Sequence, residues 1–231
     1  MFEHYKMKAM LLAAGRGERM RPLTDHTPKP LLEVAGKPLI VWHIENLVRA
    51  GIRELVINHA HLGMLIEQAL GDGSRFGAYI EYSPEAHALE TAGGIANALH
   101  MLGGEPFAVI NGDIFCDYDF ALLHERAAAI QDSGDSAHLV LVNNPIQHPG
   151  GDFGLSDNRI TVCVPRFTFS GIGIYRPDLF AGIPRGSIAP LAPLLRARIA
   201  LGKVSGEHHK GLWVDVGTPQ RLAELDRQMR T

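Results

Sequence analysis

Residues 11–32 read LLAAGRGERMRPLTDHTPKPLL, and this stretch indicates both a fold class and a kind of ligand. Apolar residues typical of a buried strand lead into a turn with Gly15 and Gly17, followed by a basic, proline-containing loop. Glycines allow positive φ and a close approach of backbone N–H groups to a ligand, and successive N–H groups hold anions. The cationic side chains around the turn, which suit phosphate, are Arg16, Arg19, Arg21 and Lys29. The stretch therefore predicts a phosphate-binding loop directly after the first strand.

The loop matches neither of two common nucleotide-binding motifs. The dinucleotide fingerprint G-x-G-x-x-G requires a third glycine where this chain has Met20. The Walker A pattern requires a second glycine followed by lysine and serine or threonine, and the loop has no such run. A nicotinamide-dependent oxidoreductase is therefore disfavoured. The alternative without a ligand is a surface turn whose arginines are simply solvated. It would explain an isolated G-x-G, but it explains the whole basic stretch less well.

Strand and helix patterns alternate along the first half of the chain. Expected strands lie at 7–13, 54–58, 78–82 and in PFAVINGD at 106–113. Expected helices lie at 39–48, 62–70, 92–102 and 120–130. This rhythm predicts an α/β, Rossmann-like fold with a mostly parallel central sheet and helices on both faces. Ligands bind at the carboxyl ends of strands in such sheets, which is where the loop lies.

The pattern is looser after Pro145. Residues 150–159 are rich in Gly, Asp and Asn and are typical of a loop. Further expected elements are strands at 160–164 and 166–175 and helices at 191–201 and 219–229. We expect the second half to extend the same sheet, so that residues 7–231 form a single domain.

Composition and charge narrow the classes of function. The chain has 231 residues, is 46% hydrophobic and carries a formal net charge of −3, so no global basic field attracts nucleic acid or an anionic membrane. No apolar run reaches the roughly 18 residues that cross a bilayer. Two cysteines are too few for a disulfide framework. We therefore expect a cytoplasmic protein that binds small molecules, and neither nucleic acid nor a membrane.

The segments LAAGRGERMRPLT and TPKPLLEVAGKPLI resemble the signature of the sugar-1-phosphate nucleotidylyltransferases, and the resemblance continues from about Met7 to the C-terminus. It implies a nucleoside triphosphate and a sugar 1-phosphate as substrates. It also implies a nucleotide-binding half at about 7–115 and a sugar-phosphate-binding half at about 116–231. Arg19 would contact the triphosphate, and Lys29 would contact phosphates at the reacting centre. Backbone contacts to the nucleotide would fall on Ala13, Ala14, Gly15 and Gly17.

Two aspartates are candidate metal ligands. Asp113 follows the apolar run FAVIN, and Asp215 lies in WVDVGTP. An aspartate at the end of a strand is most often a turn or cap residue, but both motifs resemble the two magnesium-binding segments of the family. Mg²⁺ prefers oxygen ligands and leaves room for water and phosphate. The resemblance therefore implies Mg²⁺ at Asp113 and Asp215 and in-line attack of the sugar phosphate on the α-phosphorus.

The segment YSPEAHALETAGGI resembles the part of the family that lines the base. Glu90, Thr91 and Gly94 would lie near the base, with Gly93 beside them. The alternative is a helix start at which Thr91 and Gly93 serve only capping and packing.

Three residues are candidates for the sugar phosphate: Asn111, Gly154 and Arg166. Asn111 stands two residues before Asp113, and Gly154 lies in GDFGL, which resembles a loop near the sugar. Relatives that use glucose carry Glu-Lys-Pro before the following strand, whereas this chain has VCVPRFTFSG. Arg166 is the cation available to replace that lysine, and a hexose with free hydroxyls is disfavoured.

Several segments resemble compact members of the family that act in peptidoglycan recycling: TPKPL, VINHA, GDGSRFG, LETAGGI and KVSGEH…GLWVDVGT. This implies UTP and N-acetylmuramic acid 1-phosphate as substrates. Mannose-1-phosphate guanylyl-, glucose-1-phosphate thymidylyl- and phosphocholine cytidylyltransferases are the alternatives within the fold. A non-catalytic nucleotide-sugar-binding regulator is a further alternative, against which the full reacting set argues: Arg19, Lys29, Asp113 and Asp215.

Overall fold

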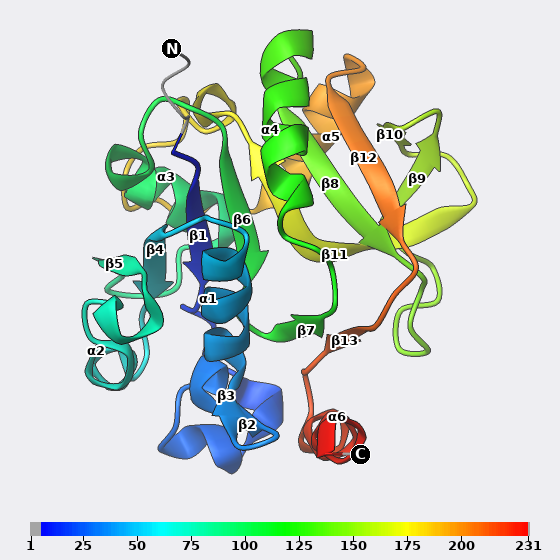
Figure 1. The fold of residues 1–231 in the computed structure, drawn as a ribbon. Helices are drawn as coiled ribbons and strands as arrows, with labels where there is room; N and C mark the ends of the chain where they lie inside the picture. Colours follow the sequence, from blue (N-terminus) through cyan, green and yellow to red (C-terminus); the bar gives the residue numbers. More distant parts are fainter. Residues whose placement is uncertain (1–5, 231) are drawn as a thin grey trace.

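A nine-stranded sheet runs through the computed structural model, which describes residues 6–230 (Figure 1). The order of the strands is β5-β4-β1-β6-β11-β8-β12-β10-β9. They span β1 (Lys8–Leu12), β4 (Glu54–His59), β5 (Tyr79–Pro84), β6 (Phe107–Asn111), β8 (Ala137–Val142), β9 (Phe153–Ser156), β10 (Arg159–Thr161), β11 (Arg166–Tyr175) and β12 (Val204–His209). Thr231, at the end of the predicted domain, lies outside the described residues.

The strands of the first half are parallel neighbours. β1 pairs in parallel with β4 and β6, and β4 with β5. β8 and β12 are also parallel, whereas β11 runs antiparallel to both β6 and β8 and joins the two halves of the sheet. β8 is buried along its whole length, as strands covered on both faces are. The predicted α/β fold is confirmed. The first half of the sheet is parallel as expected, whereas the second half is mixed: β11 is an inserted antiparallel strand, and β10 runs antiparallel to both β12 and β9.

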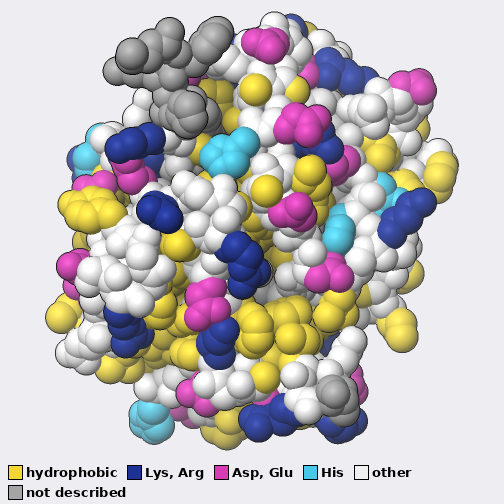
Figure 2. Space-filling view, viewed as in Figure 1, with side chains coloured by type: hydrophobic (Ala, Val, Ile, Leu, Met, Phe, Trp, Pro, Cys, Tyr) yellow, Lys and Arg dark blue, Asp and Glu magenta, His cyan; other side chains and the backbone are white. Residues whose placement is uncertain are grey.

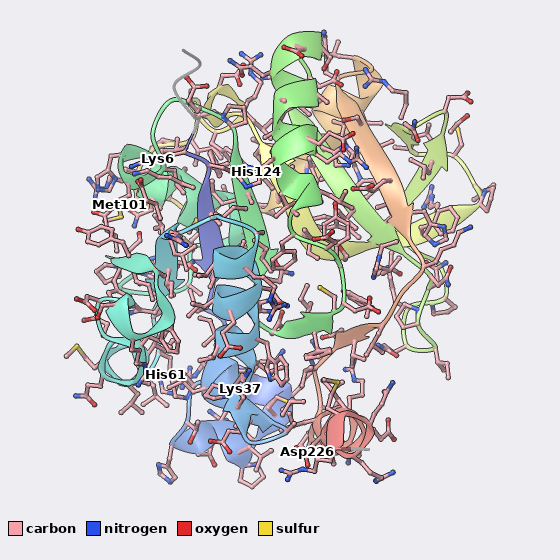
Figure 3. All side chains as sticks on the ribbon, viewed as in Figure 1. Lys6, Lys37, His61, Met101, His124 and Asp226 are labelled. Carbon is pink, nitrogen blue, oxygen red and sulfur yellow. The ribbon has the colours of Figure 1, made fainter. Side chains whose placement is uncertain are left out.

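Helices cover both faces of the sheet (Figure 1). One apolar cluster holds residues of α1 (Leu39–Arg49), α2 (Gly63–Leu70) and α4 (Leu122–Ser133). A second cluster, on the opposite face, holds residues of α3 (Glu90–Leu102) and α5 (Leu191–Ala200). His124, labelled on α4 in Figure 3, donates from Nε2 to the carbonyl of Ala50 at 2.9 Å and so connects α4 to the end of α1.

A third apolar cluster lies below the sheet, around α6 (Pro219–Arg230). It joins α6 to two short ribbons formed by β2 (Glu33–Val34) with β3 (Lys37–Pro38) and β7 (Ile114–Cys116) with β13 (Trp213–Asp215). Ala35 donates its N–H to Oδ1 of Asp226, labelled on α6 in Figure 3, at 2.7 Å. The remaining elements are 3₁₀ turns: η1 (Glu18–Met20), η2 (Leu23–Asp25), η3 (Lys29–Leu31), η4 (Ser74–Phe76) and η5 (Pro177–Leu179).

The expected loop at 150–159 is wrong, because β9 occupies its centre. β9 pairs with β10 around Asp157 and Asn158, which have φ of 50° and 58°. Two consecutive positive φ values are typical of the tight turn that matches strand twist in a hairpin, and Asp and Asn tolerate them. β12 is also absent from the expected elements, because its sequence VSGEHH is polar.

Charges of both signs are interspersed on the surface in Figure 2, and hydrophobic side chains gather between α1 and α6. Trp42, Phe115, Leu212 and Met229 line a groove there. Among residues 6–230, no helix has both the length and the apolar character that a bilayer crossing requires.

Candidate active site

The loop after β1 folds back on itself below the sheet edge. Gly17 has φ of 66°, and a Cβ there would lie 2.9 Å from Cγ2 of Thr24, so both conformation and space require glycine. Thr24 Oγ1 donates to the Gly17 carbonyl at 2.8 Å and closes the loop. The positive φ expected for both glycines is found at Gly17 only. Gly15 instead faces open space, since no atom lies within 4 Å of the Cβ it lacks.

A cavity of about 220 Å³ opens at the carboxyl ends of β1, β4 and β6. The predicted nucleotide-binding residues that line it are Ala13, Ala14, Gly15, Glu90 and Thr91. Lys29, Asn111 and Asp113 line it as well. A second hollow of about 260 Å³ shares Gly15, Lys29 and Asp113 with the cavity and adds Gly17, Arg19 and Gly217. The structure therefore brings the predicted base, phosphate and reacting-centre residues to one edge of the sheet.

Lys29 and Asp113 form an ion pair at this edge. Lys29 Nζ lies 2.6 Å from Asp113 Oδ2, with 8% of the lysine side chain and 39% of the aspartate side chain exposed. Gly112 makes this approach possible, because its N–H donates to the Leu12 carbonyl and a Cβ would lie 2.7 Å from that oxygen. The ammonium and the carboxylate neutralise each other here.

The ribbon of β7 and β13 carries Asp215 to the same place. Asp215 pairs with Ile114, and Val216 donates its N–H to the carbonyl of Asp113 at 3.0 Å. Asp113, in the turn before β7, and Asp215, at the end of β13, are thus brought close together although they are distant in sequence. Arg221 holds Asp215 through Nη1 and Oδ2 at 2.6 Å.

Arg221 is a residue that the sequence analysis missed. It lies in the first turn of α6, where Thr218 Oγ1 accepts its N–H at 3.3 Å in the manner of a helix N-cap. Gly217 makes room for the ion pair, because a Cβ there would lie 2.6 Å from Arg221 Nη2 and 3.0 Å from Asp215 Oδ1. The Thr218-Pro219 helix start in the sequence was a signal that the next turn lies close to Asp215.

His43 lies below the same ribbon. Its Nε2 donates to the carbonyl of Ile114 at 2.8 Å, and burial lowers its pKa from the usual 6.5 to about 4. Burial also raises the pKa of the Cys116 thiol to about 12, so this thiol is not a nucleophile at neutral pH. The groups that carry the chemistry of the site are therefore the charged side chains of its two ion pairs, Lys29–Asp113 and Arg221–Asp215.

Asn58 and Glu85 were also missed, although both line the cavity. Asn58 ends β4, where the rule that polar residues at the carboxyl ends of strands face a ligand could have found it. Its Nδ2 donates to Glu85 Oε1 at 2.7 Å, and its Oδ1 accepts the N–H of Ala13 at 2.9 Å. The N–H of Ala13 is consequently already engaged within the protein.

The segment that resembles a base-binding region begins α3. Glu90 has φ of 63° and is exposed at the cavity mouth beside Thr91. Gly93 and Gly94 lie behind them. Gly93 donates its N–H to Ala189, whereas a Cβ on Gly94 would lie 2.8 Å from Glu85 Oε1. Gly94 thus backs the Asn58–Glu85 pair instead of lining the cavity.

The sugar-phosphate candidates are divided between two places. Asn111 lines the cavity, and the side chain lacking at Gly171, which has φ of 84°, leaves room for its amide. Gly154 of β9 and Arg166 at the start of β11 pair with each other and do not line the cavity. The Arg166 guanidinium donates to the Val162 carbonyl at 2.8 and 3.1 Å.

The sequence of the chain is similar to those of known proteins. Residues 8–156 match the sequence profile described as nucleotidyl transferase, and the chain belongs to that family. It is 59% identical, over 94% of its length and 96% of the relative, to N-acetylmuramate alpha-1-phosphate uridylyltransferase of Neisseria meningitidis serogroup B. The protein of the same description from Caulobacter vibrioides is 36% identical over 94% of this chain and 97% of the relative.

More distant proteins share the fold. Mannose-1-phosphate guanyltransferase of Hypocrea jecorina is 32% identical over 93% of this chain, which spans 62% of that relative. Among solved structures, HddC from Yersinia pseudotuberculosis superposes with a TM-score of 0.79 at 20% identity, covering 96% of this chain and 99% of its own. A Bacillus anthracis protein crystallised with sucrose gives a TM-score of 0.84 at 22% identity, covering 97% and 95%. The Rossmann-like fold predicted from the sequence is confirmed.

Proposed function

We propose that this protein transfers a uridylyl group from UTP to N-acetylmuramic acid α-1-phosphate, giving UDP-N-acetylmuramic acid and pyrophosphate. The observation that carries the proposal is the 59% identity to the Neisseria uridylyltransferase, which extends over nearly the whole of both chains. The geometry supports it, because an enzyme of this class needs a triphosphate cradle and cations at the reacting phosphorus. Arg19, Lys29 and Asp113 lie together around one hollow.

The residues of the chain suit an in-line displacement. Backbone groups of Gly15 and Gly17 and the side chain of Arg19 hold the triphosphate, and Lys29 turns from Asp113 to the α-phosphate oxygens. An oxygen of the sugar phosphate bonds to the α-phosphorus as the bond from that phosphorus to the β-phosphate oxygen breaks. The attacking phosphate is ionised at neutral pH, so no general base is required. Lys29 stabilises the charge that develops.

Asp113 and Asp215 would hold Mg²⁺. Their carboxylates are the hard oxygen ligands that this ion prefers. Asp113 directly precedes β7 and Asp215 lies on the paired strand β13, and their charges are balanced by Lys29 and Arg221. When bound, the ion supplies charge neutralisation at the phosphates. We expect the reaction to occur in the cytoplasm, since Cys116 and Cys163 are both free thiols, which a reducing compartment preserves.

The test is pyrophosphate release from each of the four ribonucleoside triphosphates and dTTP, with Mg²⁺. Each is paired with the 1-phosphates of N-acetylmuramic acid, N-acetylglucosamine, glucose and mannose, and with phosphocholine. We expect release with UTP and the muramate. Lys29→Ala should lower kcat by about 10²–10³-fold, the usual cost of one preorganised contact to developing charge.

Lys203→Ala is the matched control, because Lys203 is exposed at the other end of β12 and should leave the rate unchanged. Turnover with a different pair, for instance GTP and mannose 1-phosphate, would overturn the substrate assignment and keep the reaction class. A chain that binds UDP-sugars but releases no pyrophosphate with any pair would be a regulator.

A further inference from the structure

A chain of buried hydrogen bonds connects three segments at the edge of the cavity. Ala13 N–H donates to Asn58 Oδ1 at 2.9 Å, and Asn58 Nδ2 donates to Glu85 Oε1 at 2.7 Å. The second carboxylate oxygen of Glu85 accepts the N–H of Leu89 at 2.9 Å. Asn58 is 3% exposed and Glu85 is 7% exposed. The end of β1, the end of β4 and the segment that leads into α3 are thereby held at fixed spacing.

The four polar atoms of the two side chains are all used within the protein. Asn58 Oδ1 accepts from Ala13 and Asn58 Nδ2 donates to Glu85 Oε1, while Glu85 Oε2 accepts from Leu89. Gly94 packs directly behind, where a Cβ would lie 2.8 Å from Glu85 Oε1 and 2.9 Å from Asn58 Nδ2. Each of the four polar atoms is therefore engaged in a bond that holds the three segments together. Buried polar groups left unpaired are costly, which favours the intact network.

We propose that Asn58 and Glu85 are positioning residues that set the distance between the end of β1 and residues 85–91, and through it the affinity and selectivity for the nucleotide base. The inference rests on the proposed function for the identity of the nucleotide. The hydrogen-bonded couple of Asn58 and Glu85 acts through the backbone of Ala13 and Leu89. It does not touch the substrate.

Isosteric single variants test the couple. In Glu85→Gln, one end of the side chain becomes an amide and meets a donor, either Asn58 Nδ2 or the N–H of Leu89. In Asn58→Asp, a carboxylate oxygen replaces the donor and meets Glu85 Oε1. Each variant leaves buried groups mispaired, so we expect the KM for UTP to rise roughly 5- to 150-fold. We expect kcat to change much less, and the preference for UTP over CTP to fall.

The double variant Asn58→Asp with Glu85→Gln exchanges the amide and the carboxylate between the two positions, and it is the decisive test of the proposal. Asp at 58 accepts the N–H of Ala13 with one oxygen and the Gln amide with the other, and the Gln carbonyl accepts the N–H of Leu89. Every hydrogen bond is restored with the same net charge, and only the bond between residues 58 and 85 has its direction reversed. We expect the KM for UTP and the selectivity to return to within about threefold of the parent protein.

Failure of this restoration overturns the proposal, because a Glu85 carboxylate that contacts the nucleotide directly could not be replaced by one at 58. Normal kinetics in both single variants overturn it too. Glu105→Gln, on an exposed residue, is the matched control and should behave as the parent. If a single variant does not fold, Gly94→Ala takes its place, since its Cβ displaces both side chains and should raise the KM for UTP.

Calorimetric binding of UTP to the same variants separates this proposal from the proposed function. A parent protein that binds UTP without turnover would contradict the uridylyl transfer while the binding series still tests the couple. If the parent protein turns over UTP and the muramate while the single variants keep the parent's affinity for UTP, only the positioning role of Asn58 and Glu85 is contradicted.

Discussion

Gly93 and Gly94 stand side by side in α3 but make room for different kinds of neighbour. A Cβ on Gly93 would lie 2.3 Å from the Ser187 carbonyl and 3.0 Å from the Ala189 nitrogen, which are backbone atoms. A Cβ on Gly94 would meet the side chains of Glu85 and Asn58, which can move. The sequence pattern GG gives no means to tell these two roles apart.

We expect Gly93→Ala to lower the free energy of unfolding by roughly 1–3 kcal/mol, as overpacking against backbone does. Gly94→Ala should cost less stability, partly offset by the better helix propensity of alanine, which is worth up to about 1 kcal/mol. Urea unfolding midpoints of the two variants measure the difference. Equal losses would mean that the 187–189 segment yields as easily as two side chains.

Burial of His43 makes stability depend on pH. Its pKa is lowered to about 4 in the folded protein, against 6.5 in an unfolded chain. Between these values the unfolded chain binds a proton that the folded protein does not, so the free energy of unfolding falls as the pH falls from 6.5 to about 4. The difference corresponds to about 3 kcal/mol. Above pH 6.5 the contribution is complete, and below about 4 no more is lost.

His43→Gln removes the titration and keeps a donor for the Ile114 carbonyl. Urea unfolding at pH 7, 6, 5 and 4 should show a shallower loss for this variant than for the parent protein. Parallel curves for the two proteins would place the acid sensitivity in other groups.

The residues that hold charge at the site were predictable, whereas the residues that position them were not. Lys29 lies in the TPKPLL motif of the loop and Asp113 follows the strand FAVIN, and the structure brings Lys29 Nζ to 2.6 Å from Asp113 Oδ2. Asn58, Glu85 and Arg221 act through contacts between segments that are distant in sequence. A periodicity or a local motif carries no information about such contacts.

At the scale of elements, α6 and the β7–β13 ribbon together position Asp215. The ribbon sets the register of Asp215 against Ile114, and α6 supplies Arg221 to the carboxylate. Thr218 starts the helix, since its Oγ1 accepts the N–H of Arg221 and its carbonyl accepts the N–H of Leu222. The cap and the ion pair therefore depend on the same turn.

Thr218→Ala should lower the free energy of unfolding by about 1 kcal/mol, the usual cost of losing an N-cap. Because Arg221 is then less well placed, we also expect kcat/KM to fall, and Thr218→Ser to retain both values. Urea midpoints and steady-state rates measure the two effects. A cap variant with lower stability and unchanged kcat/KM would show that the position of Arg221 does not depend on the cap.

The helices and the parallel strands of the first half were predictable because each is strongly patterned. The two- and three-residue strands β2, β3 and β7 were not predicted, and neither was β8. β9 and β12 were missed for different reasons. β9 is four residues long and lies beside its turn, so its Gly and Asp content conceals the strand. β12 is polar because it lies near the edge of the sheet, and its place is fixed by pairing with β8. Tertiary pairing decides such strands, and local composition does not.

At the scale of the whole molecule, one sheet contains strands from both halves of the chain. β11 lies between β6 and β8, and Ile172 pairs with both Ile110 and Val140. We therefore predict that the chain unfolds in a single cooperative transition, as one domain does. The two tryptophans report on different halves, since Trp42 lies in α1 and Trp213 in β13.

Trp42→Phe and Trp213→Phe variants leave one fluorescent reporter each. Their urea transitions, each followed by fluorescence and by circular dichroism, should give the same midpoint for both probes in each variant. Separate midpoints for the two probes would contradict a single domain and point to a first half that unfolds independently.

The position of β11 has a consequence for the protein during its synthesis. β6 and β8 are synthesised before β11, although β11 belongs between them. Until then the growing chain carries an open strand edge at β6, the kind of edge that recruits chaperones or pairs with other chains. Asp215 emerges later still, after β12. A nascent chain can thus assemble the nucleotide cradle early, but it acquires the second aspartate only when translation has passed the whole sheet.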